Sequence, residues 1–327
     1  MEFSEDRVQF YPNRITIAPH RKQDLMFALE RKAGLHPSIK NLSKKKTSVN
    51  LSTSSKKNIR DSIFAMYQFS KPRTVQISSG KFIYNFRQSF VTLTLPSKQV
   101  HSDVEIKKCL NHFLTNVRRK FGVQNYVWKA ELQKNANIHF HLSFDKYLPF
   151  GAIQWYWLLA IKPLGYVESY SKKFREMSLI QYADNRKLSI ADAIRPFANG
   201  KRFNWTKPNC VDVSAVTTAS SVSNYLSKYF AKSDDSNLDA GRVEKFGKVW
   251  ARSQSLSKLE WKHKFDYSEV KEFIRQCLAM GGLKKIAYDF ATVYYVNFKK
   301  LVGVHRRWFD FIVISEGKRY NYPFPAT

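Results

Sequence analysis

The sequence predicts an α+β fold, because strand-like runs and helical periodicity occur in one chain and a hairpin joins two of the strands. Residues 81–95 are rich in β-branched and aromatic side chains, as strands are. Residues 103–121 repeat apolar side chains at helical spacing. A strand at 126–132, a turn at 134–137 and a second strand ending at Phe144 form the predicted β-hairpin.

The remaining elements surround this core. Residues 151–166 are aromatic and apolar, and we expect a helix there that covers the sheet. The polar stretch 170–207 has no clear periodicity. The other predicted elements are a strand at 212–216, a helix at 220–232, a helical block around 270–280 and a strand at 308–314.

The chain divides into three parts by composition. Residues 1–60 are predicted to be a basic N-terminal extension, in which 38–60 form a flexible linker because they are polar, cationic and poor in apolar periodicity. Residues 61–258 form the main domain. Residues 259–327 form a C-terminal accessory segment, whose paired cations suggest duplex DNA binding or partner docking.

The charge balance points to a polyanionic partner. The chain has 55 Lys and Arg against 26 Asp and Glu, a formal charge of +29. Aromatic residues make up 15% of it, and exposed rings beside cations suit single-stranded nucleic acid, whose bases stack on them. The alternative is that most of these rings are core.

Three further features bear on location and redox state. The longest apolar stretch, 152–161, is too short for a membrane span, which needs about 20 residues. The first residues lack a secretory pattern, so we expect a cytoplasmic protein. Cys109, Cys210 and Cys277 have no metal or redox spacing and are expected to be reduced.

Two histidines are candidate metal ligands. His139 and His141 flank Phe140, so on a strand they project from the same face. Glu131 lies across the predicted turn. With a two-residue loop Glu131 pairs with Phe140 and faces away from the histidines, whereas a three-residue loop or a bulge pairs it with His139 on the same face. Gln133 shares the parity of Glu131 and is the fallback ligand. Two imidazoles and a carboxylate suit Mn²⁺ or Mg²⁺. The alternative is two histidines on an ordinary polar strand face.

Two tyrosines are candidate nucleophiles. Tyr225 and Tyr229 are four residues apart, so a helix places both on one face, about 6 Å apart. A phenol attacks phosphate only when its proton is removed or its oxyanion is stabilised. Lys228 and Lys232 repeat the spacing and could neutralise the phosphate or favour the phenolate. The alternative is an amphipathic helix with both tyrosines in the core.

These segments resemble the three motifs of the HUH-superfamily rolling-circle replication initiators. Residues 90–96, Phe-Val-Thr-Leu-Thr-Leu-Pro, resemble the first motif. Glu131 with His139-Phe-His141 resembles the metal motif. Residues 225–232 resemble the third motif in the two-tyrosine form of microvirus A proteins and related phage and plasmid initiators. The distance between the second and third motifs implies an insertion near 165–205.

The resemblance implies an antiparallel sheet with flanking helices, related to the RNA-recognition fold. It also implies an endonuclease and strand transferase that nicks single-stranded DNA at an origin hairpin or nick site. One tyrosine would stay covalently attached to the 5′ end, leaving a 3′-OH primer, and the other would act when the strands are rejoined. We expect Tyr225 to act first.

The expected setting is the cytoplasm of a bacterial host cell, with no membrane contact. Residues 241–249 depart from a phosphate-binding loop in spacing and in the residue after Lys248, so a host helicase is expected, together with a host polymerase. A relaxase or transposase would use similar chemistry. The alternative from another class is a basic nucleic-acid-binding protein without catalysis, whose histidines and tyrosines are structural.

Overall fold

A computed structural model describes residues 7–11, 14–18, 51–70, 72–77, 79–133, 135–218, 221–222, 225, 247–257, 263–288, 291–297 and 299–305. The chain forms two compact units. Unit 1 combines residues 1–48, 52–69 and 254–327, and unit 2 combines 49–51 with 70–253. Unit 2 contains the candidate site.

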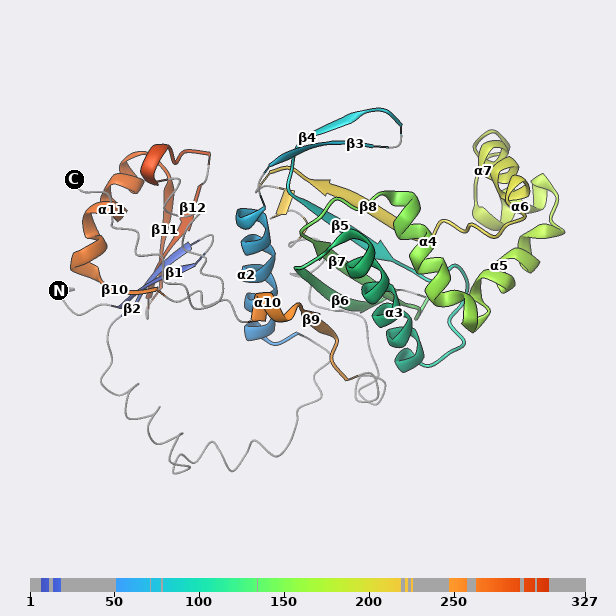
Figure 1. Ribbon diagram of the computed structural model, residues 1–327, viewed down its shortest axis with the longest axis horizontal. Helices are drawn as coiled ribbons and strands as arrows, with labels where there is room; N and C mark the ends of the chain where they lie inside the picture. The colour runs from blue at the N-terminus through green and yellow to red at the C-terminus, as the bar shows by residue number, and fades with distance from the viewer. Residues whose placement is uncertain are drawn as a thin grey trace, which may run out of the picture. The chain divides into compact units, whose positions relative to one another are not determined.

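Unit 2 is built on one antiparallel sheet (Figure 1). Its strands, in spatial order, are β8 (Val211–Val216), β5 (Gln88–Leu93), β7 (Ile138–Phe144), β6 (Tyr126–Leu132) and β9 (Trp250–Arg252). A separate hairpin pairs β3 (Arg73–Gln76) with β4 (Phe82–Phe86).

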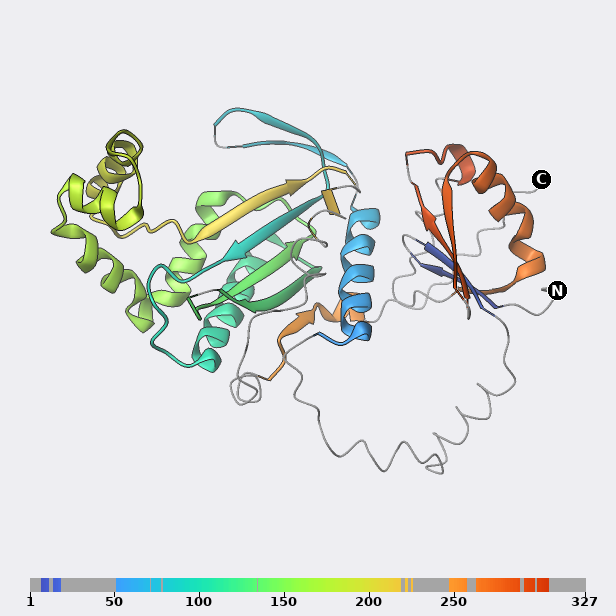
Figure 2. The ribbon, with the colours of Figure 1, turned by 180° about the vertical axis from the view of Figure 1, so that it is seen from behind.

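The two faces of the five-stranded sheet differ because side chains alternate along each strand. Val91, Phe140 and Leu142 point to one face, where they join the main core of unit 2. Helices α3 (Asp103–Phe121) and α4 (Phe150–Ile161) supply the rest of that core. These helices lie in front of the sheet in Figure 1 and behind it in Figure 2. The strand residues of opposite parity therefore form the other face.

Helix α3 begins and ends where its sequence dictates. The Ser102 hydroxyl accepts a hydrogen bond from the Glu105 backbone N–H, and the Glu105 carboxylate accepts one from the Ser102 N–H. Gly122 ends the helix in the left-handed conformation, with φ of 62°. The predicted helix at 103–121 is thereby confirmed.

The predicted insertion region, near 165–205, holds a group of helices that continues from α4. After the 3₁₀ turn η2 (Lys162–Leu164) the helices are α5 (Tyr166–Arg175), α6 (Leu179–Arg186) and α7 (Ile190–Arg202). They surround their own aromatic cluster, which includes Tyr170, Phe174 and Trp205. Figures 1 and 2 both show α5, α6 and α7 together at one end of unit 2, beyond α4.

Unit 1 contains a second five-stranded antiparallel sheet. Its strands, in spatial order, are β10 (His263–Asp266), β1 (Arg7–Tyr11), β2 (Arg14–Ala18), β12 (Ala291–Val296) and β11 (Leu283–Tyr288). The other elements of this unit are α2 (Thr53–Phe69), α10 (Gln254–Ser257) and α11 (Tyr267–Ala279). Val270 and Ile274 of α11 pack against Val8 and Ile15 in one core.

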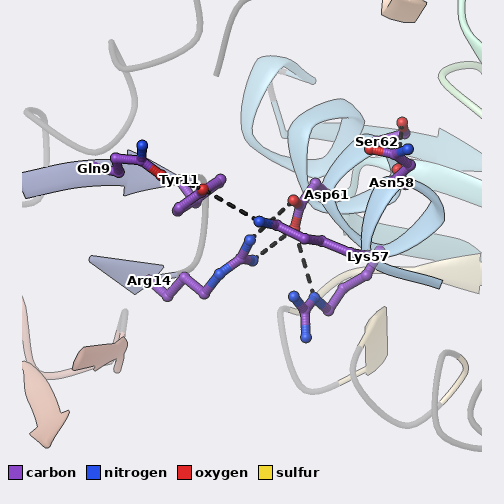
Figure 3. Close-up of polar contacts among 8 residues, drawn as sticks. Gln9, Tyr11, Arg14, Lys57, Asn58, Asp61 and Ser62 are labelled. Atoms are coloured by element: carbon purple, nitrogen blue, oxygen red, sulfur yellow. Dashed lines mark hydrogen bonds and ion pairs between the residues drawn. The ribbon is translucent and has the colours of Figure 1, made fainter. Parts of the chain in front are cut away.

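A buried ion pair joins β2 to α2 (Figure 3). The Arg14 guanidinium donates two hydrogen bonds to the Asp61 carboxylate, at 2.6 and 3.0 Å, and the two side chains are only 5% and 4% exposed. Arg14 also lies 3.9 Å from the centre of the Tyr11 ring. The Lys57 ammonium donates to the Tyr11 hydroxyl at 3.2 Å.

The predicted fold class is confirmed, since helices flank antiparallel sheets. The predicted elements at 126–144, 151–166, 212–216 and 270–280 correspond to β6 and β7, α4, β8 and α11. The predicted strand at 308–314 lies outside the described residues. No helix in the described part of the chain is long and apolar enough to cross a membrane.

The ends of the chain differ from the sequence reading. Helix α2 begins at Thr53, inside the predicted linker 38–60, because Ile59 and Ile63 form a buried helical face that the Ser and Lys residues conceal. Strands β1 and β2 lie in the predicted extension 1–60, yet β2 pairs with β12 of the predicted accessory segment 259–327. These pairings join segments that the sequence reading separates.

Candidate metal centre and tyrosine

The turn between β6 and β7 decides which side chains share the site. Gln133 donates its backbone N–H to the Asn137 carbonyl at 2.8 Å, so three residues separate the two paired positions and the loop is a three-residue one. Ala136 has φ of 63°, the left-handed conformation typical of the last position of such a loop. Glu131 consequently pairs with His139, and the register expected for a three-residue loop is confirmed.

Glu131, His139 and His141 form one cluster on the face opposite the main core. The Glu131 Oε2 atom lies 3.2 Å from Nε2 of His141 and 3.7 Å from Nε2 of His139. One ligand atom from each of the three residues falls within 4.8 Å of the others. His141 is 1% exposed, while His139 and Glu131 keep side-chain exposures of 15% and 24%. The cluster is therefore buried on one side and accessible on the other.

Lys129 adds a buried cation to this cluster. It pairs with His141 across the hairpin, and its Nζ atom lies 4.0 Å from Oε2 of Glu131. Burial raises the pKa of Glu131, but the contacts with His139, His141 and Lys129 outweigh it and hold that pKa well below its usual value. Glu131 is thus a carboxylate at neutral pH, able to bind a cation.

Thr92 holds His141 from the neighbouring strand. The two residues pair between β5 and β7, and the Thr92 hydroxyl lies 3.2 Å from Nδ1 of His141. Burial lowers the pKa of His141, as do the charges of His139 and Lys129, although Glu131 opposes them. A neutral imidazole whose Nδ1 contacts Thr92 presents Nε2 toward Glu131.

Tyr225 lies beside the cluster. Its ring stacks on Phe90 with centroids 3.5 Å apart and planes 8° apart, and it meets the His141 ring edge-on at 6.4 Å. Thr218 starts the helical segment that carries Tyr225, because its hydroxyl accepts a hydrogen bond from the Ser221 N–H at 3.1 Å. Phe90, two residues before Thr92, thus positions the phenol next to the histidines.

The donor set fits a hard divalent cation. Two imidazole nitrogens and one carboxylate oxygen that converge within 4.8 Å are a ligand combination used by Mn²⁺ and Mg²⁺ sites that leave positions open for substrate oxygen and water. The exposed side of His139 and Glu131 provides the path for that substrate.

The structure brings together four of the predicted site residues, namely Glu131, His139, His141 and Tyr225. Tyr229, Lys228 and Lys232 lie outside the described residues. The fallback ligand Gln133 pairs with Asn137 at the turn. Sequence reasoning missed Lys129, although its parity with Glu131 was a signal, and it gave no role to Thr92.

Comparison with known proteins gives one family and no individual relative. No curated protein and no solved structure matches this chain. The family match spans residues 88–234 and covers each described side chain of the site, from Phe90 to Tyr225. Those residues match the ORF2 family of replication-associated proteins, which supports a role for this chain in the initiation of replication, with DNA as its partner.

Proposed function

We propose that this protein is an HUH-type endonuclease and strand transferase that nicks single-stranded DNA at a replication origin and later rejoins the strands. The observation that carries the proposal is the position of Tyr225, edge-on to His141 and beside the Glu131, His139 and His141 cluster. A nucleophilic phenol next to a cation site is the arrangement that tyrosine attack on a phosphodiester requires. The match to replication-associated proteins supports the same reading.

In the proposed reaction, the Tyr225 oxygen bonds to phosphorus and the bond from phosphorus to the 3′ oxygen breaks. The tyrosine loses its proton and the departing 3′ oxygen gains one, so the products are a 5′-phosphotyrosine and a 3′-OH primer. Bound Mn²⁺ or Mg²⁺ would polarise the phosphate and stabilise the leaving oxygen. Glu131, His139 and His141 would hold that cation, and Thr92 keeps His141 oriented.

The second tyrosine gives the reaction its end. Tyr229 would attack the regenerated origin junction, and the freed 3′-OH would then displace Tyr225 to close the released strand. Lys228 and Lys232 would neutralise the phosphate during both steps. The protein would remain covalently attached to DNA throughout the round of synthesis, which a host helicase and polymerase would carry out.

A covalent adduct tests the proposal. The protein is incubated with Mn²⁺ and labelled single strands that cover the parent replicon, and adducts are resolved under denaturing conditions. We expect an adduct on Tyr225 or Tyr229, located by mass spectrometry of the DNA-linked peptide. Tyr225→Phe with Tyr229→Phe should abolish it, while DNA affinity stays near wild type because many cations supply it.

The control is Tyr84→Phe, which changes a tyrosine in the β3–β4 hairpin that is 66% exposed. This variant should form the adduct normally. If the double variant still forms an adduct, or if the wild type forms none with any strand, the protein is a binding module and the proposed nuclease is wrong.

The cation site is tested by Mn²⁺ titration calorimetry. Glu131→Gln removes a charged ligand, so Mn²⁺ affinity should fall by at least about tenfold and adduct formation should fall with it. Glu168→Gln, which alters a carboxylate that is 76% exposed, should leave both unchanged. Equal Mn²⁺ affinity in wild type and Glu131→Gln would exclude Glu131 as a ligand.

A further inference from the structure

We infer that helices α6 and α7 form a helix-turn-helix that binds duplex DNA, with α7 as the helix that enters the major groove. The two helices are joined by a short turn at residues 187–189. Lys187 has φ of 54°, a left-handed residue that ends α6, and Ser189 begins α7 through a hydrogen bond from the Asp192 N–H. A three- to four-residue turn between two packed helices is the signature of this motif.

The lobe has its own core, as a DNA-reading module requires. Each helix contributes buried side chains to one aromatic cluster: Tyr170 and Phe174 from α5, Tyr182 and Ala183 from α6, and Ala193 and Phe197 from α7. Trp205 closes the cluster by stacking on Phe174 at 5.4 Å. Gly200 is needed for this closure, because a side chain there would meet the Trp205 ring. The outer side of α7 is consequently fixed by packing.

The exposed face of α7 has the shape and charge of a groove-reading helix. Ala191, Arg195, Ala198 and Arg202 recur at helical spacing on the side opposite Ala193 and Phe197, and all four are exposed. The alanines allow close approach to a surface, and the arginines can reach guanine edges or phosphates. Neither arginine forms an ion pair within the described part of the chain.

Residues at the start of α7 supply apolar contacts. Ile190 and Ile194 are 47% and 54% exposed, and the N-terminal residues of a recognition helix are those that meet base edges, where thymine methyl groups bind apolar side chains. Asp192 is the carboxylate nearest this face, and its side chain accepts a hydrogen bond from the Ser189 hydroxyl at 2.7 Å. That contact holds it at the helix end.

Neighbouring cations favour DNA as the occupant of this face. Residues 166–207 carry nine Lys and Arg against four Asp and Glu, and the exposed cations outside α7 include Lys172, Lys173, Lys187 and Lys207. Phosphate contacts of this kind position a duplex around the recognition helix. This binding does not depend on tyrosine chemistry, so it would place the nuclease at a duplex site before any strand is cut.

The test uses full-length protein carrying Tyr225→Phe and Tyr229→Phe, so that covalent adducts do not interfere. Fluorescence anisotropy measures binding to a pool of short duplexes with randomised centres and to the matching single strands. Arg195→Ala with Arg202→Ala should weaken duplex binding by about tenfold or more and spare single-strand binding. The slope of log affinity against log salt should fall by about 0.9 for each arginine that contacts a phosphate.

The charge-matched control is Arg119→Ala with Lys120→Ala, two exposed cations in the last turn of α3. It should lower duplex and single-strand binding equally and only slightly. Ala191→Glu is a second variant that keeps a good helix former and places a negative charge on the reading face, and it should also lose duplex binding. Both α7 variants should melt at the wild-type temperature.

Three outcomes would overturn the inference. The first is duplex affinity in the α7 variants equal to that of the control variant. The second is a loss of single-strand binding as large as the loss of duplex binding. The third is that the α7 substitutions abolish binding to anionic lipid vesicles while duplex binding stays unchanged, because the exposed isoleucines would then serve a membrane surface.

Discussion

A single hydroxyl group, that of Thr92, orients the most buried ligand of the candidate metal centre. It lies 3.2 Å from Nδ1 of His141, which faces Glu131 with its other nitrogen. Contacts of this kind with the second ring nitrogen fix both the tautomer and the orientation of a metal-binding histidine, and losing one costs about 10- to 100-fold in metal affinity. Thr92 is therefore expected to act through His141.

Thr92→Val should lower Mn²⁺ affinity by about 10- to 100-fold, because valine keeps the volume and removes the hydroxyl. Thr92→Ser should restore most of it. Thr94→Val is the matched control, since its hydroxyl donates to the Cys210 carbonyl at 3.1 Å, away from the cluster. Calorimetry with Mn²⁺ measures each variant. Equal affinity in Thr92→Val and Thr94→Val would remove the orienting role.

At the level of elements, the hairpin of β6 and β7 determines the site through the length of its loop. The alternating residues alone could not decide whether Glu131 faces the histidines, because one residue more or less in the loop reverses the face. The left-handed conformation of Ala136 completes the three-residue loop. An alanine gives no sequence signal for that conformation, whereas a glycine would have predicted the register.

Ala136→Gly should stabilise the protein by about 0.5–1 kcal/mol, because a left-handed residue with a Cβ costs about 1–2 kcal/mol and glycine returns part of that gain as chain entropy. The side chain is exposed, so no packing is lost. Gly122→Ala is the opposite change, at a left-handed position with open space around it, and should destabilise by about 1 kcal/mol. Urea denaturation midpoints measure both. A lower midpoint for Ala136→Gly would contradict the strain argument.

Elements with strong local signals were predicted well, and those defined by distant partners were not. Helix α3 has apolar periodicity and a capping box, so its sequence specifies both ends. Strands β1 and β2 are short, and β2 gains its neighbour β12 from nearly the opposite end of the chain. Composition also hides Lys129, which is 1% exposed although lysine is usually a surface residue.

At the level of the whole molecule, unit 1 depends on a contact between segments that the sequence reading treats as an extension and the start of the main domain. Arg14 and Asp61 are both buried and bind each other through two hydrogen bonds. Removing one member of a buried pair leaves the other charge without compensation, which costs about 3–5 kcal/mol.

Asp61→Asn should therefore destabilise unit 1 by up to about 3–5 kcal/mol and leave the site in unit 2 intact. Hydrogen exchange should show faster exchange in peptides from β1, β2 and α2, with unchanged protection in β5, β6 and β7. Glu272→Gln, which alters an exposed pair with Arg275 in the same unit, should have almost no effect. Unchanged protection of β2 in Asp61→Asn would show that the ion pair contributes little.

The pairing of β2 with β12 also sets an order of events during synthesis. The ribosome releases the strands of unit 2, from β5 to β9, before β12 exists. The sheet of unit 1 has β2 next to β12 and so cannot close until residue 296 has been made. Domains fold as their last strand becomes available. The nascent chain should consequently assemble its histidine cluster while β1 and β2 still await their partners, so a ribosome stalled after residue 260 would carry a folded site on an incomplete protein.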